Sequence, residues 1–198
     1  MITAQQLAEI DPRTKTADPA CVGALNDAFH EFGITSKQDV AAVLGMILGE
    51  SGGFHVFLEN MNSSDPARIA AIFHRKFPGG AQEAVPYVHN PQKLAARVYE
   101  LEGGNGPESS GDGWTYRGHG AGQVTYKNTL LQCLKDTGIK TLDELAQPVG
   151  AMRSAVWFFC KVGAKGKPTF EAVFKLFQPS MVGLDLHKPF YTKAMTLL

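Results

Sequence analysis

The pattern of hydrophobic and polar positions predicts a succession of short helices. The strongest pattern follows Ser36, where apolar side chains recur at offsets of 0, 3, 4, 7 and 8, which is the spacing of one helical face. These positions are Val40, Val43, Leu44, Ile47 and Leu48. Ser36 and Asp39 supply an N-terminal capping signal for this helix. We expect its last turn to contain Glu50.

Capping residues and prolines predict where other helices begin. Thr3-x-x-Gln6 is a capping box, and three pairs place a capping residue before a proline at the first helical position: Asp18-Pro19, Asp65-Pro66 and Asn90-Pro91. Further helical patterns lie near residues 127–135, after Thr141, through 152–162, near 170–177 and after Lys188-Pro189. Strand patterns are scarce, so we predict a mainly α fold.

Residues 103–125 are rich in glycine and polar groups and form the longest irregular stretch. Such a stretch in a compact domain is typical of a binding loop or a small hairpin. No internal repeat and no linker interrupts the chain. We therefore predict a single domain over residues 1–198, with two helical lobes around the glycine-rich loop and a groove between them that would suit a polymer.

Composition and charge fit a globular protein and leave its partners open. The chain has 198 residues, 44% of them hydrophobic, and 19 basic residues balance 19 acidic ones. Residues 151–198 carry seven basic residues and two acidic ones. This basic helical part either contacts an anionic polymer or is a solvated helical face, and the second interpretation is favoured. Nucleic-acid binding is not indicated.

Several other classes of protein are disfavoured. No apolar run is long enough to cross a bilayer, and the N-terminus lacks the pattern of a secretory signal. We therefore expect synthesis in a cytoplasm and no stable membrane insertion. Cys21, Cys133 and Cys160 are widely spaced, which predicts buried free thiols. The six histidines show no metal-ligand spacing, and we predict no metal.

Candidate chemistry begins at Glu50, which follows Val43, Met46 and Ile47 at helical spacing. That spacing places its carboxyl on the buried side of the helix, where desolvation and the negative helix end would both raise its pKa. A carboxyl group held protonated near neutrality can act as a general acid. Equally, Glu50 can fray outward at the helix end beside Gly52-Gly53. Periodicity does not separate these alternatives.

A second carboxylate, Glu59, lies nine residues further on in a segment without helical periodicity. Two carboxyl groups can cleave a glycosidic bond when one protonates the leaving oxygen and the other activates water. Their separation is roughly 6.5–9.5 Å in inverting enzymes and roughly 5–5.5 Å in retaining ones. On spacing alone, however, Glu59 is better explained as a surface residue.

Ordered motifs over about residues 40–130 resemble the lysozymes and chitinases of glycoside hydrolase family 19, and among these the phage endolysins most. The motifs are Gly49-Glu50-Ser51-Gly52-Gly53-Phe54, Glu59-Asn60-Met61-Asn62-Ser63-Ser64, Ala96-Arg97-Val98-Tyr99, Gly104-Asn105-Gly106, the run from Gly111 to Gly120, and Gln123-Val124-Thr125. The resemblance implies a lysozyme-like helical fold, an inverting mechanism and no cofactor.

The resemblance also implies roles for individual residues. Glu50 becomes the general acid and Glu59 the general base, with Thr125 helping to hold the water and Gln123 hydrogen-bonding the sugar. Asn62 lies in a matching motif and is a candidate for substrate binding.

In the glycine-rich loop, Trp114 and Tyr116 offer flat faces for sugar rings, and Arg117 could bind polar groups of the substrate. The alternatives are core positions for the two aromatic residues and an internal ion pair for Arg117.

The chain departs from the family pattern in four places. His119 replaces the second arginine of Arg-Gly-Arg-Gly, and Tyr126 replaces the glycine after Thr125. Thr129-Leu130 stands where Asn-Tyr is expected, and the late Asn-Gly-Gly motif is absent near residues 177–183. These departures affect the assignment of binding residues after position 125.

The leading hypothesis is an endolysin that hydrolyses the β-1,4 bonds between N-acetylmuramic acid and N-acetylglucosamine in peptidoglycan. It would act as a monomer in the periplasm after holin-type release. A chitinase is the second enzymatic hypothesis, although the short interval between Glu50 and Glu59 favours the endolysin branch. A third hypothesis is a non-catalytic glycan-binding or virion protein on the same scaffold.

Overall fold

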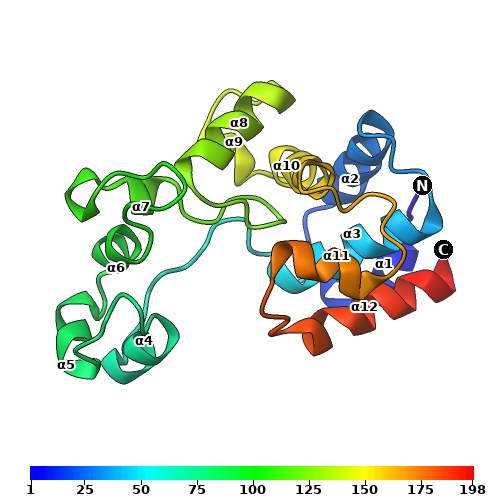
Figure 1. The fold of residues 1–198 in the computed structure, drawn as a ribbon. Helices are drawn as coiled ribbons and strands as arrows, with labels where there is room; N and C mark the ends of the chain where they lie inside the picture. Colours follow the sequence, from blue (N-terminus) through cyan, green and yellow to red (C-terminus); the bar gives the residue numbers. More distant parts are fainter. The chain divides into compact units, whose positions relative to one another are not determined.

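The computed structural model describes residues 1–198 and is built almost entirely of helices (Figure 1). The α-helices are α1 (Ala4–Ile10), α2 (Ala20–Glu31), α3 (Lys37–Glu50), α4 (Pro66–Ile72), α5 (Ala81–Ala84), α6 (Pro91–Val98), α7 (Asp112–Thr115), α8 (Lys127–Thr137), α9 (Leu142–Leu145), α10 (Pro148–Lys161), α11 (Phe170–Phe177) and α12 (Leu184–Leu197). Three 3₁₀ helices, η1 (Pro12–Thr16), η2 (Val85–Tyr87) and η3 (Glu108–Ser110), complete them. The β-structure consists of one isolated bridge between His119 and Val124. The predicted mainly α fold is confirmed.

The chain forms two compact units. Unit 1 contains residues Met1–Phe57, His119–Val124 and Cys133–Leu198, and unit 2 contains Leu58–Gly118 and Thr125–Gln132. The chain passes between them four times, once within α8. Each unit has its own hydrophobic cluster. The predicted substrate cleft between two lobes stays a prediction.

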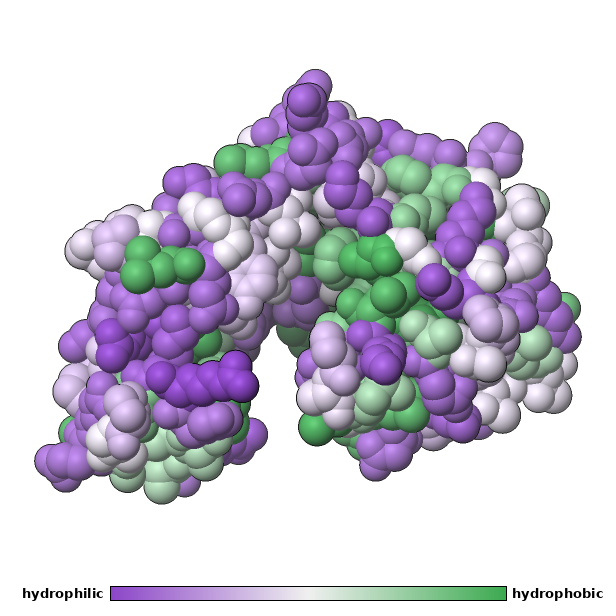
Figure 2. Space-filling view, in the orientation of Figure 1, coloured by the Kyte–Doolittle hydropathy of each residue, from purple (hydrophilic) through white to green (hydrophobic).

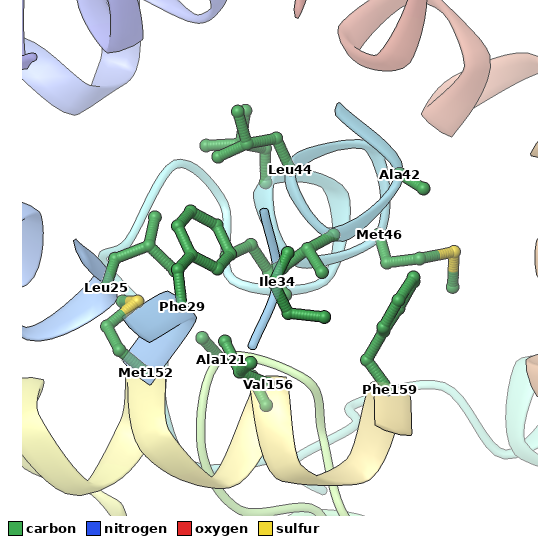
Figure 3. Packing of buried hydrophobic residues seen from close by; sticks show 14 of the residues in the cluster. Leu25, Phe29, Ile34, Ala42, Leu44, Met46, Ala121, Met152, Val156 and Phe159 are labelled. Atoms are coloured by element: carbon green, nitrogen blue, oxygen red, sulfur yellow. The ribbon is translucent and has the colours of Figure 1, made fainter. Parts of the chain in front are cut away.

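Helix α3 is the central element of unit 1. Its residues from Ala41 to Leu48 are all buried, and it packs against α10, α11 and α12. Figure 3 shows Leu44 and Met46 of α3 together with Leu25 and Phe29 of α2, and with three side chains of α10, namely Met152, Val156 and Phe159. A helix that is apolar on nearly every side must be covered on every side, which explains its position.

The core of unit 2 is smaller and gathers around α4 and α6. Ile69, Phe77 and Leu94 are almost completely buried there. The Phe77 ring meets the Tyr87 ring edge-on at 5.0 Å between centroids. Helix α7 packs against α6 through Gly113, where an added Cβ would collide with the backbone of Ala95. This packing fixes the loop that carries Trp114 and Arg117.

Most helix starts predicted from capping residues are confirmed. The side chains of Thr3, Ser36, Asp65, Asn90 and Thr141 each accept a hydrogen bond from a backbone N–H in the first turn. Asp18 accepts from the backbone N–H of Ala20 at 2.9 Å, although α2 itself begins after Pro19. These signals succeed because capping depends on residues only two or three positions apart.

The predicted helix start at Lys188-Pro189 is wrong. Helix α12 begins at Leu184, after Gly183 in the left-handed conformation, and Pro189 lies inside it. A proline within a helix removes one backbone hydrogen bond, and this loss makes proline a good start signal in sequences. Here the packing of α12 against α3 extends the helix past that point. The shift brings His187 into the helix.

The irregular segment 103–125 contains the short helices η3 and α7. Its β-structure is limited to the single bridge between His119 and Val124. It is therefore a loop with short helices and not a strand hairpin. Gly103 and Gly104 adopt positive φ, and added Cβ atoms would collide with the side chains of Tyr126 and Asn128. The glycines thus let the start of α8 lie directly on this loop.

Other sequence expectations concern thiols, membranes and surface. All three cysteines are free, with Cys21 and Cys133 buried and Cys160 half-buried. None of the helices has the length and apolar character needed to cross a membrane. Figure 2 shows one face, where hydrophobic residues form small patches among hydrophilic ones.

Candidate functional site

Glu59 lies in unit 2 in an extended segment that is held by the loop before Gly118. The backbone N–H of Glu59 donates to the Gly118 carbonyl at 2.9 Å, and the Gly118 N–H donates back to Glu59 Oε2 at 3.0 Å. The Tyr99 hydroxyl donates to Glu59 Oε1 at 2.7 Å. An ionised carboxylate can only accept hydrogen bonds, and both of these groups are donors. The arrangement therefore suits a charged, oriented carboxylate.

Tyr99 is itself fixed by Tyr126. Their rings meet edge-on, with centroids 5.6 Å apart and planes at 88°. Burial and the neighbouring Glu59 raise the pKa of Tyr99 well above its ordinary value, so its hydroxyl stays a donor at all physiological pH values. The Tyr126 hydroxyl donates to Glu102 at 3.1 Å, and burial raises its pKa to about 12.

Tyr126 also explains one departure from the family pattern. It has φ of +78°, in the left-handed region where glycine is strongly favoured. A tyrosine there carries backbone strain of about 1–3 kcal/mol, which the surrounding structure must offset. Its ring contact with Tyr99 and its bond to Glu102 supply contacts that glycine lacks.

Arg117 and Trp114 support the same segment. Arg117 is 8% exposed. Its Nε donates a hydrogen bond to the Glu59 backbone carbonyl at 3.2 Å, and its NH1 group donates to the Trp114 carbonyl at 2.6 Å. The guanidinium lies 3.6 Å from the Trp114 ring centroid, a cation–π contact. Burial lowers the pKa of Arg117, and the charge of Glu59 opposes this. These contacts give Arg117 and Trp114 a supporting position, and their predicted binding of substrate stays a prediction.

Glu59 is among the residues that line a groove of about 380 Å³. Asn62 and Arg68 line it with Glu59, so the structure brings one predicted binding residue to the predicted base. Arg68 is exposed and makes no hydrogen bond or ion pair within the chain. The groove is therefore lined by polar and apolar side chains together, with a cation available for a ligand. Its other lining residues are Asn60, Met61, Ser63, Ser64, Asp65, Ile69, Ile72, Phe73 and Leu94.

Glu50 lies in unit 1 as the last residue of α3. Its side chain is 41% exposed, so of the two positions left open by the sequence the outward one is correct and the buried one is wrong. The carboxyl remains at the negative end of the helix, where the charged form is disfavoured. His187 of α12 faces it, with 3.5 Å between Nε2 and Glu50 Oε1.

A tight turn after Glu50 ends the helix abruptly. Gly52, Gly53 and Phe54 have φ of +58°, +74° and +72° in succession. The buried Ser51 hydroxyl donates to the Ile47 carbonyl at 2.5 Å and accepts from the Phe54 N–H at 3.0 Å. Phe54 is 2% exposed and anchors the turn in the core of unit 1. The position of Glu50 is therefore set by a rigid frame.

The remaining predicted residues have the following positions. Gln123 belongs to unit 1, has φ of +49°, and its Nε2 donates to the Gly120 carbonyl at 3.1 Å. Thr125 is half-buried and begins the second stretch of unit 2. Tyr116 is half-buried, and Lys127 Nζ lies 5.5 Å from its ring centroid. His119 is buried within unit 1.

Sequence reasoning missed Tyr99, Arg68 and His187. Tyr99 lies in a motif that matches the family, so its position carried a signal but no role. Arg68 has only helical spacing after Asp65-Pro66 and no distinguishing neighbour. His187 lies outside the predicted helix, because the sequence pattern predicts that this helix starts after Lys188-Pro189.

Glycosidic cleavage uses two carboxyl groups, and the oriented carboxylate of Glu59 beside a groove can supply one of them. No family model matches the chain. Its sequence is 30% identical over 174 residues to a glycosyl hydrolase family 19 domain-containing protein of Haemophilus influenzae. That similarity covers 87% of this chain and 86% of the relative. The chain therefore belongs to glycosyl hydrolase family 19.

Proposed function

We propose that this glycoside hydrolase cleaves the β-1,4 bonds between N-acetylmuramic acid and N-acetylglucosamine in peptidoglycan, as an endolysin does. The observation that carries the proposal is the carboxylate of Glu59, which is held by Tyr99 and Gly118 and lines the same groove as Arg68. Family membership supports glycan hydrolysis. The groove supports the choice of glycan.

The proposed reaction needs one acid and one base. Glu50 in its protonated form donates its proton to the oxygen of the glycosidic bond as the bond to the anomeric carbon breaks. Glu59 takes a proton from a water molecule, whose oxygen attacks that carbon from the opposite face. The anomeric configuration inverts, Glu50 ends ionised and Glu59 ends protonated. Exchange with solvent restores both.

Arg68 favours peptidoglycan over chitin. N-acetylmuramic acid and its peptide carry carboxylates, whereas chitin is an uncharged polymer of N-acetylglucosamine. An exposed guanidinium without an internal partner can bind such a carboxylate with two parallel hydrogen bonds. A neutral glycan offers Arg68 hydrogen-bond acceptors but no carboxylate to form an ion pair.

Replacing Arg68 by alanine tests this choice of substrate. We expect KM for soluble peptidoglycan fragments to rise roughly 10–100-fold, because a hydrogen bond to a charged group contributes about 1.5–3 kcal/mol. Hydrolysis of chitin oligosaccharides, if measurable, should change little. Arg75→Ala is the matched control, because Arg75 is an exposed arginine of unit 2 outside the groove.

Other outcomes would contradict the proposal in different ways. An equal loss of activity on both substrates would show that Arg68 does not recognise a carboxylate of the substrate. Cleavage of chitin without cleavage of peptidoglycan would identify a chitinase. Binding of either glycan without cleavage would favour a non-catalytic role for the scaffold.

A further inference from the structure

His187 occupies a buried position directly against the end of α3. His187 is 8% exposed, and the centroid of its ring lies 5.2 Å from the centroid of the Phe174 ring on α11. The ring Nδ1 is 3.0 Å from the Gly45 carbonyl, and Nε2 is 3.5 Å from Glu50 Oε1. The ring therefore links the backbone of α3 to the Glu50 side chain. Figure 1 shows α12 and α11, the parent helices of His187 and Phe174.

The sequence of α3 leaves room for this ring. Gly45 and Gly49 stand one turn apart on the helix. A Cβ added at Gly49 would come within 3 Å of three ring atoms of His187, and one added at Gly45 would collide with Phe170. Glycine at position 49 thus lets the imidazole rest on the helix backbone, where its two nitrogens reach different partners.

The Gly45 carbonyl determines which nitrogen carries the proton. A carbonyl oxygen only accepts, so Nδ1 must be the donor, and the neutral ring presents the lone pair of Nε2 toward Glu50. In that state Nε2 can accept a hydrogen bond from the protonated carboxyl of Glu50. When the ring is charged, the same nitrogen pairs with the Glu50 carboxylate. The ring can therefore contact the Glu50 side chain in either of these states.

Other charged groups near α12 are engaged elsewhere or lie further from the ring. Glu171 of α11 and Lys188 of α12 pair with each other at 2.6 Å. Glu50 is the acidic group within 4 Å of the His187 ring nitrogens. The remaining charged residues on helices packed against α12, or on α12 itself, are Glu9, Lys37, Asp39, Lys175, Asp185 and Lys193.

We propose that His187 is a positioning residue for Glu50, which orients the carboxyl group and sets the alkaline limit of its activity. This inference rests on the proposed function, in which Glu50 is the acid. Above the alkaline limit Glu50 has no proton to donate. With His187 present, the protonated carboxyl group can donate a hydrogen bond to Nε2. Without His187 the carboxyl group loses that acceptor.

The test compares pH–rate profiles of the full chain and of His187→Gln on soluble peptidoglycan. We expect the alkaline limb to move toward acid, because the protonated form of Glu50 loses a hydrogen-bond acceptor. A purely structural role would lower the rate by one factor at every pH and leave the limb in place. That result would overturn the proposal. His30→Gln, at an exposed histidine of α2, is the control.

A second measurement does not depend on activity. NMR of the His187 ring nitrogens in the unaltered chain should show the proton on Nδ1 in the neutral form. Glu50→Gln should change the chemical shift of Nε2, because the group that faces this nitrogen changes. An unchanged Nε2 resonance would overturn the contact, even if glycans are cleaved. If no glycan is cleaved but the Nε2 resonance changes, the proposed function fails and the contact stands.

His187→Asn serves if the glutamine variant does not fold, because its amide keeps a donor near the Gly45 carbonyl. Thermal melts of each variant establish folding before the rates are compared. The Glu50→Gln spectrum uses the native His187 and tests the contact without either substitution.

Discussion

At the scale of single residues, the candidate base depends on neighbours that have no chemistry of their own. Glu59 looked like a surface residue from spacing alone, and only the family resemblance indicated a role. The structure adds the reason: Tyr99 and Gly118 both donate to its carboxylate. These partners are 40 and 59 residues away in the chain, and no local pattern could have paired them. The exposure of Glu50 was equally undecided by its helical spacing.

Tyr99→Phe tests this support for Glu59. The change keeps the ring and its contact with Tyr126 but removes one hydrogen bond to the carboxylate. We expect kcat to fall by roughly 10–100-fold with KM nearly unchanged, since hydrogen bonds to charged groups contribute about 1.5–3 kcal/mol. Steady-state kinetics on soluble peptidoglycan measures it.

Tyr87→Phe is the control, because the Tyr87 hydroxyl bonds Glu108 and not Glu59. If both variants behave alike, the bond from Tyr99 does not orient the base.

At the scale of helices, local signals predicted starts well and packing poorly. Ser36 and Thr141 cap their helices as expected, because the bonds involve residues three positions apart. The start of α12 was wrong, because a tertiary contact with α3 outweighs the proline signal. No pattern in the sequence assigns a packing role to Gly45 or Gly49 of α3. In the structure they are the places where Phe170 and His187 approach it.

Gly49→Ala should therefore destabilise unit 1. The added methyl group collides with the His187 ring, and overpacking of this kind costs about 1–3 kcal/mol. Urea unfolding followed by circular dichroism measures the change.

Gly23→Ala on α2 is the matched control. A Cβ at Gly23 meets nothing within 4 Å, so alanine should stabilise the chain by about 0.5–1 kcal/mol. A stable Gly49→Ala variant would contradict the close packing of α12 on α3.

At the scale of the whole molecule, the sequence predicted the mainly α class and the scarcity of strands. It described the chain as one domain with two lobes, and two compact units are observed, each with a separate hydrophobic cluster. The division follows from long-range contacts, since residues 119–124 belong to unit 1 although the segments on either side belong to unit 2. Such an exchange of segments leaves no mark in local periodicity.

Burial of the thiols gives a prediction for the folded chain. Desolvation raises the pKa of Cys21 to about 11 and that of Cys133 to about 12. Because the thiolate is the reactive form, neither residue should react with iodoacetamide at pH 8 while the chain is folded. Both should react in guanidinium chloride. Peptide mass spectrometry locates the label, and rapid modification of Cys133 in the native chain would contradict its burial.

In the proposed function, Glu50 and Glu59 together hydrolyse the glycan of peptidoglycan. The most direct test is mass spectrometry of borohydride-reduced fragments after peptidoglycan is incubated with the wild type, Glu50→Gln and Glu59→Gln. We predict reduced muramic acid ends from the wild type, and losses of about 10²–10⁴-fold in both variants at unchanged thermal stability. Reduced glucosamine ends would place the cut at the other linkage. Full activity of Glu50→Gln would contradict the role of Glu50 as the acid. No fragments from the wild type would contradict hydrolysis of peptidoglycan.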